Sequence, residues 1–105
     1  DLSHPEIIAE TADEDQLHPV YPATEGLTQP TLGKLMAQAL RLAEKEGLLR
    51  EYLPAPFRER FGLMPLAQAL WRLHRPRREE GVPDENDPAR ARLAFEELLA
   101  AIEQS

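Results

Sequence analysis

The segment from residue 18 to residue 42, HPVYPATEGLTQPTLGKLMAQALRL, constrains the fold of this chain most strongly. Its first part is extended, because Pro19 and Pro22 fix φ and keep the residues before them out of the helical region. Its second part carries apolar residues at helical spacing. These are Leu32, Leu35, Met36, Ala39 and Leu40, continued by Ala43. With Thr28 at the N-cap position, the sequence predicts an amphipathic helix over about 29–46.

Glycine and proline mark the limits of three further predicted helices. Gly47 ends the first helix, and a short second helix begins at Pro56 and is closed by Gly62. A third helix begins at Pro65 and is ended by Pro76. The fourth helix is capped by Asp87 and starts at Pro88. The third helix is expected to turn Leu66, Ala67, Leu70 and Leu73 towards the core, with Trp71 on its flank, and the fourth to turn Ala91, Phe95, Leu98 and Ile102 inwards. The predicted fold class is mainly α: a small irregular unit of about four helices behind an extended Pro-rich N-terminal segment.

Length and charge bound what such a chain can do. With 105 residues it forms one domain at most. No apolar run is long enough to cross a bilayer, and without cysteine neither disulfides nor thiolate chemistry are available. The net charge of −7 is concentrated in residues 1–27, which hold seven acidic and no basic side chains. Since Lys and Arg supply affinity for phosphate, charge alone argues against a DNA-binding module.

The sequence offers little material for catalysis. Gly33-Lys34 is the single Gly-Lys pair, but it lacks the first glycine and the hydroxyl residue of a phosphate-binding loop. The two serines, Ser3 and Ser105, lie at the ends of the chain. The histidines are His4, His18 and His74, and none has a second His at helical spacing with which to bind a metal ion. His74 is interpreted as the end of the third helix, where a partly charged ring interacts favourably with the helix dipole. No catalytic, cofactor-binding or metal-binding residue is predicted.

One cluster could contact nucleic acid: Arg72, Arg75, Arg77 and Arg78. Five acidic residues follow at once, so the alternative is a solvated, self-compensating loop over residues 75–87, exposed and mobile. Two interpretations also apply to the aromatic side chains of Tyr21, Trp71 and Phe95. They could stack on bases, but their proline-rich or apolar neighbours favour a place in the core.

Several blocks of the chain resemble the RecG family of ATP-dependent DNA helicases, in the segment that follows the wedge domain. The block around VYP carries Val20, Tyr21, Pro22, Glu25, Gly26, Leu27, Gln29, Thr31, Leu32, Lys34 and Leu35. The other blocks are His4-Pro5-Glu6, Leu53-Pro54, Ala67 to Leu70, Leu73 to Pro76 and Ala89 to Leu99. Together they cover essentially the whole chain in the family's order.

The resemblance implies that residues 1–27 leave the wedge domain and act as a linker, and that residues 28–105 form a helical connector leading to the helicase motor. The chain, which begins at Asp1, would then be a fragment of a larger cytoplasmic protein that is a monomer and has no membrane partner. That parent would use ATP and magnesium to remodel stalled replication forks and branched DNA junctions in repair and recombination. The wedge and helicase domains and branched DNA are the implied partners, and no catalytic residue falls in this portion.

The alternative is a free-standing helical protein-interaction module without enzymatic activity. The fourth helix separates the two hypotheses. A connector leaves Phe95 and Leu98 exposed for a further domain, whereas a free-standing module closes its core with them.

Overall fold

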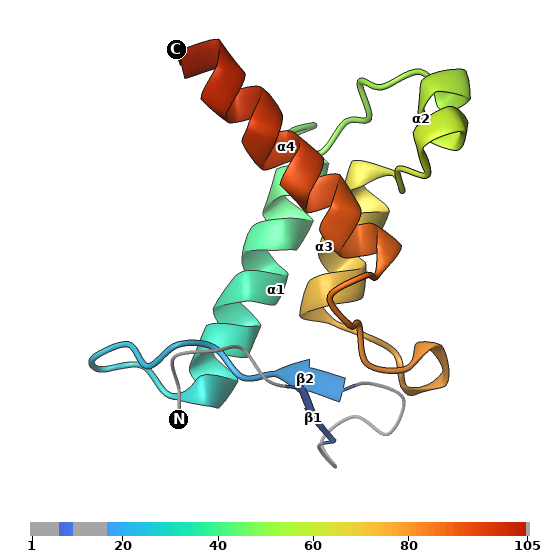
Figure 1. The fold of residues 1–105 in the computed structure, drawn as a ribbon. Coiled ribbons are helices and arrows are strands. Elements are labelled where there is room, and N and C mark those ends of the chain that lie inside the picture. Colours follow the sequence, from blue (N-terminus) through green and yellow to red (C-terminus); the bar gives the residue numbers. More distant parts are fainter. Residues whose placement is uncertain (1–6, 10–16, 105) are drawn as a thin grey trace.

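The computed structural model describes residues 7–9 and 17–104, and it is mainly helical, as predicted (Figure 1). The helices are α1 (Gln29–Lys45), α2 (Ala55–Phe61), α3 (Leu66–His74) and α4 (Pro88–Gln104), with a 3-10 turn at Arg78–Glu80. Two short strands, β1 (Ile7–Ala9) and β2 (Leu17–Pro19), pair antiparallel with Ile8 opposite His18. Residues 10–16, which belong to the expected linker over residues 1–27, lie outside the described residues.

The first helix begins and ends where the sequence predicted. The Thr28 hydroxyl accepts a hydrogen bond from the Thr31 amide at 3.3 Å, which satisfies one free amide of the first turn. Gly47 has φ of +75°, and the amide of Leu48 donates to the carbonyl of Ala43 at 2.8 Å. This left-handed residue turns the chain away from the helix axis and satisfies a carbonyl of the last turn.

Local signals also fix the later helices. Gly62 is left-handed, with φ of +64°, and the following amide of Leu63 donates to the carbonyl of Arg58 at 2.9 Å. At the start of α4, the Asp87 carboxylate accepts from the Ala89 amide at 2.9 Å. The predicted boundaries therefore hold to within about one residue.

The core lies where α3 meets α1 and α4, and α3 also contacts β2 (Figure 1). Its buried residues are small: Ala37 of α1, Ala69 of α3 and Ala89 of α4 are almost fully buried, together with Leu40 and Val20. Side chains without bulk let helix backbones approach closely, so the core is formed by helix crossings and not by a layer of large apolar side chains.

In α1 and α4 the buried face differs from the predicted one by a rotation of part of a turn about the helix axis. In α1, Leu35 is largely exposed and Ala37 is buried in its place. In α4, Ala91, Leu98 and Ile102 face outwards, the last two being 59% and 60% exposed. Because each of these helices packs along one narrow contact, the contact follows its smallest residues and leaves part of the apolar stripe uncovered.

The segment 75–87 was predicted to be an exposed loop, and this is wrong in part. Pro76 and Pro83 are buried, and residues 78–80 form the 3-10 turn. The segment folds back on α3 because the Arg72 side chain of α3 donates hydrogen bonds to the carbonyls of Glu80 and Gly81.

Candidate functional site

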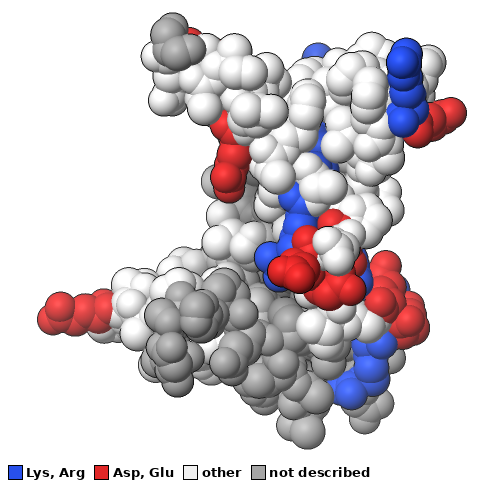
Figure 2. Space-filling view, viewed as in Figure 1, with Lys and Arg blue, Asp and Glu red and all other residues white. Residues whose placement is uncertain are grey.

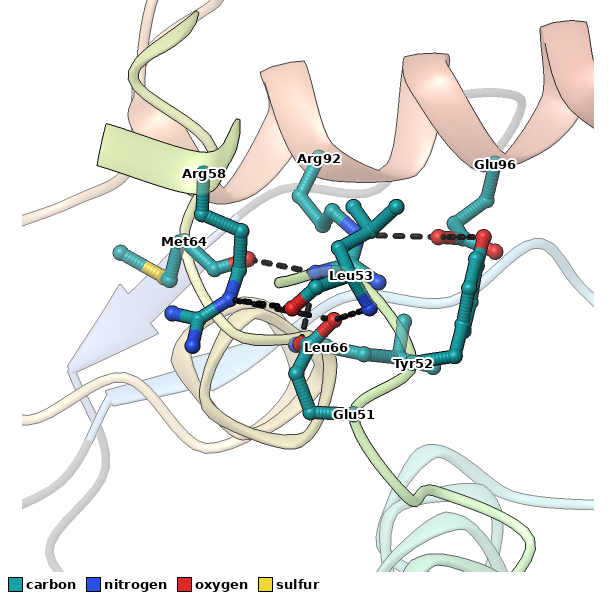
Figure 3. Close-up of polar contacts among 8 residues, drawn as sticks. All are labelled: Glu51, Tyr52, Leu53, Arg58, Met64, Leu66, Arg92 and Glu96. Carbon is teal, nitrogen blue, oxygen red and sulfur yellow. Dashed lines mark hydrogen bonds and ion pairs between the residues drawn. The ribbon is translucent and has the colours of Figure 1, made fainter. Parts of the chain in front are cut away.

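The most buried charge of the described residues is the guanidinium of Arg92 on α4 (Figure 3). Its Nη1 donates to Glu51 Oε1 at 2.8 Å and to the carbonyl of Met64 at 2.9 Å, and its Nε donates to Glu96 Oε2 at 2.8 Å. The ring of Tyr52 lies 5.5 Å from the guanidinium carbon. A buried arginine is tolerated only when it is paired in this way.

Glu51 is the hub of this network. Its Oε1 also accepts from the Leu66 amide at 2.8 Å, and its Oε2 accepts from the Leu53 amide at 2.9 Å. Burial by itself raises the pKa of Glu51, but the hydrogen bonds from Arg92 and these two amides outweigh it and lower the pKa to about 2. The carboxylate is therefore charged at neutral pH, and it ties the segment before α2, the start of α3, and α4 together.

Tyr52 and Glu96 close the network on its other side. The Tyr52 hydroxyl donates to Glu96 Oε2 at 2.6 Å, the same oxygen that accepts from Arg92. The sequence reasoning missed this cluster, because Glu51 and Arg92 lie 41 residues apart. The spacing of Arg92 and Glu96 by four residues was the one available signal.

The predicted arginine cluster divides into different roles. Arg72 binds Asp87 through Nη2 at 2.8 Å and through Nε at 3.3 Å, and its Nη1 donates to the Gly81 carbonyl at 2.8 Å. Burial raises the pKa of Asp87, but the hydrogen bonds from Arg72 and from the Ala89 amide outweigh it and lower the pKa. Arg72 thus fastens the segment after α3, and the first turn of α4, to α3.

The remaining arginines of the cluster lie nearer the surface. Arg77 is 64% exposed, and its Nη1 is 3.9 Å from Glu79 Oε1. Arg72, Arg75 and Arg77 line one hollow between α3 and the start of α4, whereas Arg78 is not part of its lining. On the face shown in Figure 2, basic and acidic side chains of the described residues lie next to one another, so no broad basic surface forms there.

A second polar cluster fastens the extended segment to the helices. The Gln29 side chain accepts from the Tyr21 amide at 2.7 Å and donates to the Tyr21 carbonyl at 2.9 Å. The Tyr21 ring stacks on His74 with centroids 6.0 Å apart, and the hydroxyl lies 3.2 Å from His74 Nδ1. Tyr21, Gln29 and His74 come from two of the blocks that carry the family resemblance, and the fold brings them together.

His74 is the last residue of α3, as predicted, but its expected charge is not supported. Burial lowers the pKa of His74, which favours the neutral ring near pH 7. A neutral ring interacts less with the helix dipole than the partly charged imidazole that the sequence suggested.

The one Gly-Lys pair of the sequence does not form a phosphate-binding loop. Gly33-Lys34 lies inside α1, where the backbone amides are used in helical hydrogen bonds and cannot cradle phosphate. Among residues 7–9 and 17–104, no group of three His, Asp or Glu side chains gathers to hold a metal ion. None of the described helices combines the length and the apolar composition that a membrane span needs.

Comparison with known proteins gives the class first: the chain is similar to part of ATP-dependent DNA helicases. The helicases that it matches all carry the name RecG. The chain is 43% identical over 103 residues to RecG of Escherichia coli (strain K12), 39% identical over 112 residues to that of Pasteurella multocida (strain Pm70), and 41% identical over 108 residues to that of Haemophilus influenzae.

Each of these alignments covers 95% of this chain but 14% or 15% of the relative. The resemblance predicted from the sequence blocks is therefore confirmed, and it concerns a small segment of the helicase. No protein-family model and no solved structure matches the chain.

Proposed function

We propose that this chain is a non-catalytic connector of a RecG-like ATP-dependent DNA helicase, which couples the wedge domain to the motor. The parent enzyme would act in the cytoplasm, as a monomer, on stalled forks and branched DNA, with ATP and magnesium bound by its motor. The observation that carries this proposal is the similarity of 95% of the chain to a segment that makes up 14% of RecG.

The packing supports a mechanical role. Motor movement shifts DNA against a wedge only if the element between them is stiff, because a compliant link absorbs the displacement. Here α3 joins α1 and α4 through buried alanines, and the charged network of Glu51 and Arg92 locks the segment before α2 against both α3 and α4. Close-packed interiors of this kind transmit strain.

The fourth helix also supports the connector. Leu98 and Ile102 are more than half exposed, so α4 presents an apolar stripe that a further domain would cover. Phe95 differs from the expectation: it is half-buried, with its ring centroid 6.1 Å from that of Phe57. The same exposed stripe supports the second candidate, a free-standing interaction module whose partner binds α4.

The test uses the full-length helicase and the pair Leu40→Ala and Leu42→Ala. Leu40 is buried in α1 whereas Leu42 is 60% exposed on the same helix, so only the first substitution leaves a cavity, at a cost of about 2–5 kcal/mol. We expect Leu40→Ala to lower fork unwinding per ATP hydrolysed while hydrolysis persists, and Leu42→Ala to change neither rate.

Both rates are measured on the same branched substrate, with hydrolysis followed by phosphate release. Loss of hydrolysis in parallel with unwinding in Leu40→Ala would contradict the coupling role. A full-length natural chain that lacks a motor would instead favour the interaction module.

A further inference from the structure

The chain between β2 and α1 is a surface loop, which leaves β2 and returns to the start of α1 (Figure 1). Residues 22–28 are all exposed, and the loop contains its own turn, in which the Leu27 amide donates to the Thr24 carbonyl at 3.1 Å. An exposed loop with local hydrogen bonds holds its neighbours weakly. The position of the extended segment therefore depends on the residues just before the loop, the buried Val20 and the half-buried Tyr21.

The Gln29 side chain closes the base of this loop. Gln29 is the first residue of α1, and its amide binds both backbone groups of Tyr21: Oε1 accepts from the N–H at 2.7 Å, and Nε2 donates to the carbonyl at 2.9 Å. A neighbouring β-strand would bind the backbone in the same way, through one acceptor and one donor. A carboxylate cannot donate and an ammonium group cannot accept, so the pairing needs an amide. The backbone of residue 21 is thereby fixed to α1.

The Tyr21 side chain fixes the same residue to α3. Its ring lies nearly parallel to that of His74, with an interplanar angle of 11° and centroids 6.0 Å apart, and its hydroxyl is 3.2 Å from Nδ1. Burial raises the pKa of Tyr21, against the opposing effect of the Arg75 charge, and burial lowers the pKa of His74. Both groups are therefore neutral near pH 7, which lets the hydroxyl donate to Nδ1 while Nε2 carries the ring proton.

Tyr21 is thus held twice, through its backbone by α1 and through its ring by the last residue of α3. One attachment would leave a pivot, whereas two attachments to different helices define a direction. The helix α3 also contacts α4, so the direction is set relative to the whole helical unit. We call Tyr21, Gln29 and His74 the Tyr21 clamp.

We propose that the Tyr21 clamp fixes the direction in which the extended segment leaves the helical unit, and that its three members are positioning residues for fork unwinding. The inference rests on the proposed function, because that function places the wedge before the extended segment and the motor after the helices. When the clamp is open, the exposed loop over residues 22–28 becomes a hinge that absorbs the displacement produced by the motor. When the clamp is closed, the displacement reaches the wedge.

The first test measures this geometry in the full-length helicase by the distance between two spin labels. The labels are attached at Ala9→Cys in β1 and at Glu97→Cys on the exposed side of α4, after cysteines elsewhere in the helicase have been replaced, since this chain contains none. Gln29→Met keeps the length and the helix propensity of the side chain but removes the amide. We expect a narrow distribution of distances in the doubly labelled protein and a broader one after Gln29→Met.

The matched control is Gln38→Met, which makes the same change at an exposed position of α1 and should leave the distribution narrow. If Gln29→Met left the distribution as narrow as Gln38→Met does, the clamp would be overturned.

The second test measures unwinding of a branched substrate and phosphate release in the same variants. We expect Gln29→Met to lower unwinding per ATP hydrolysed roughly twofold or more while hydrolysis persists, because the loss of two hydrogen bonds populates the open clamp. Gln38→Met should change neither rate. A broader distance distribution with an unchanged coupling ratio would overturn the positioning role, and so would a loss of hydrolysis in parallel with unwinding.

Milder variants keep the test usable if Gln29→Met fails to fold. Tyr21→Phe keeps the ring and loses the hydroxyl, so it should broaden the distribution less than Gln29→Met but more than Gln38→Met. His74→Asn and His74→Leu both lose the stacked ring, but asparagine retains an acceptor, so it should broaden the distribution less than leucine. Equal broadening by the two His74 variants would remove His74 from the clamp and overturn the proposal as stated.

The clamp and the connector can fail separately. Both labels lie within this chain, so the distances judge the clamp whatever Leu40→Ala does to the coupling ratio. Narrow distributions in every clamp variant, together with uncoupling in Leu40→Ala, would overturn the clamp and leave the connector intact.

Discussion

Replacing Glu51 with glutamine tests whether the buried network holds the helices together. The carboxylate has donors on both oxygens: the Leu66 amide and Arg92 at Oε1, and the Leu53 amide at Oε2. Glutamine offers one oxygen and an NH2 group, so at least one of these donors then faces another donor. It also leaves the buried guanidinium of Arg92 without a charged partner at that position.

The pKa gives the magnitude. A decrease in the pKa of Glu51 from 4.5 to about 2 corresponds to roughly 3 kcal/mol of stabilisation of the folded state. The Glu51 side chain is 22% exposed, so solvent screening reduces this to about 2 kcal/mol. In a domain of this size that loss lowers Tm by roughly 10 °C.

The pH dependence follows from the sign of the shift. Because the folded pKa of Glu51 lies below the unfolded one, its contribution is fully present above pH 4.5 and is lost as the pH falls towards about 2. The stability difference between the native chain and Glu51→Gln should therefore be constant near neutral pH and should shrink below pH 4.5.

The assay is urea unfolding followed by far-UV circular dichroism, at neutral pH and at several acidic values. Glu97→Gln is the matched control, since Glu97 is exposed on α4 and should lose little stability. If Glu51→Gln were as stable as the native chain at neutral pH, or if it kept the native pH dependence, the assigned role of the network would be refuted.

Two further predictions use the same unfolding assay. Arg72→Met should cost about 2–4 kcal/mol, because it leaves the partly buried Asp87 carboxylate unpaired, whereas Arg41→Met on the surface of α1 should cost little; equal effects would show that the ion pair is not structural. Gly33→Ala should raise the free energy of unfolding by up to about 1 kcal/mol, since Gly33 lies within α1 and an added Cβ meets nothing within 4 Å. Gly47→Ala should lower the free energy of unfolding by about 1 kcal/mol, because φ is +75° there. Effects of the same sign at the two glycines would contradict the assigned backbone conformations.

The boundaries of the elements could be predicted because their causes are local. Thr28, Gly47, Gly62 and Asp87 each act on amides or carbonyls within five residues of themselves, so the short-range sequence contains the whole interaction. The same holds for the turn at Gly26, where the Leu27 amide donates to the Thr24 carbonyl at 3.1 Å.

The resemblance to RecG was also readable from the sequence alone, since it depends on the order of short blocks. What those blocks do was not readable. The fold shows that Gln29 holds the backbone of Tyr21, and that Tyr21 stacks on His74 from a block 53 residues away.

By itself, then, the sequence determined a mainly helical unit, the limits of its helices and its relationship to a helicase segment. The tertiary structure alone decided which side of α1 and α4 is buried, and it placed Arg92 in the interior beside Glu51. It also divided the arginine cluster, because Arg72 pairs with Asp87 in a partly buried position whereas Arg77 lies at the surface. The physical reason is the same in each case. The buried face of a helix and the partner of a charged side chain depend on residues far along the chain, and hydrophobic periodicity does not indicate which residues these are.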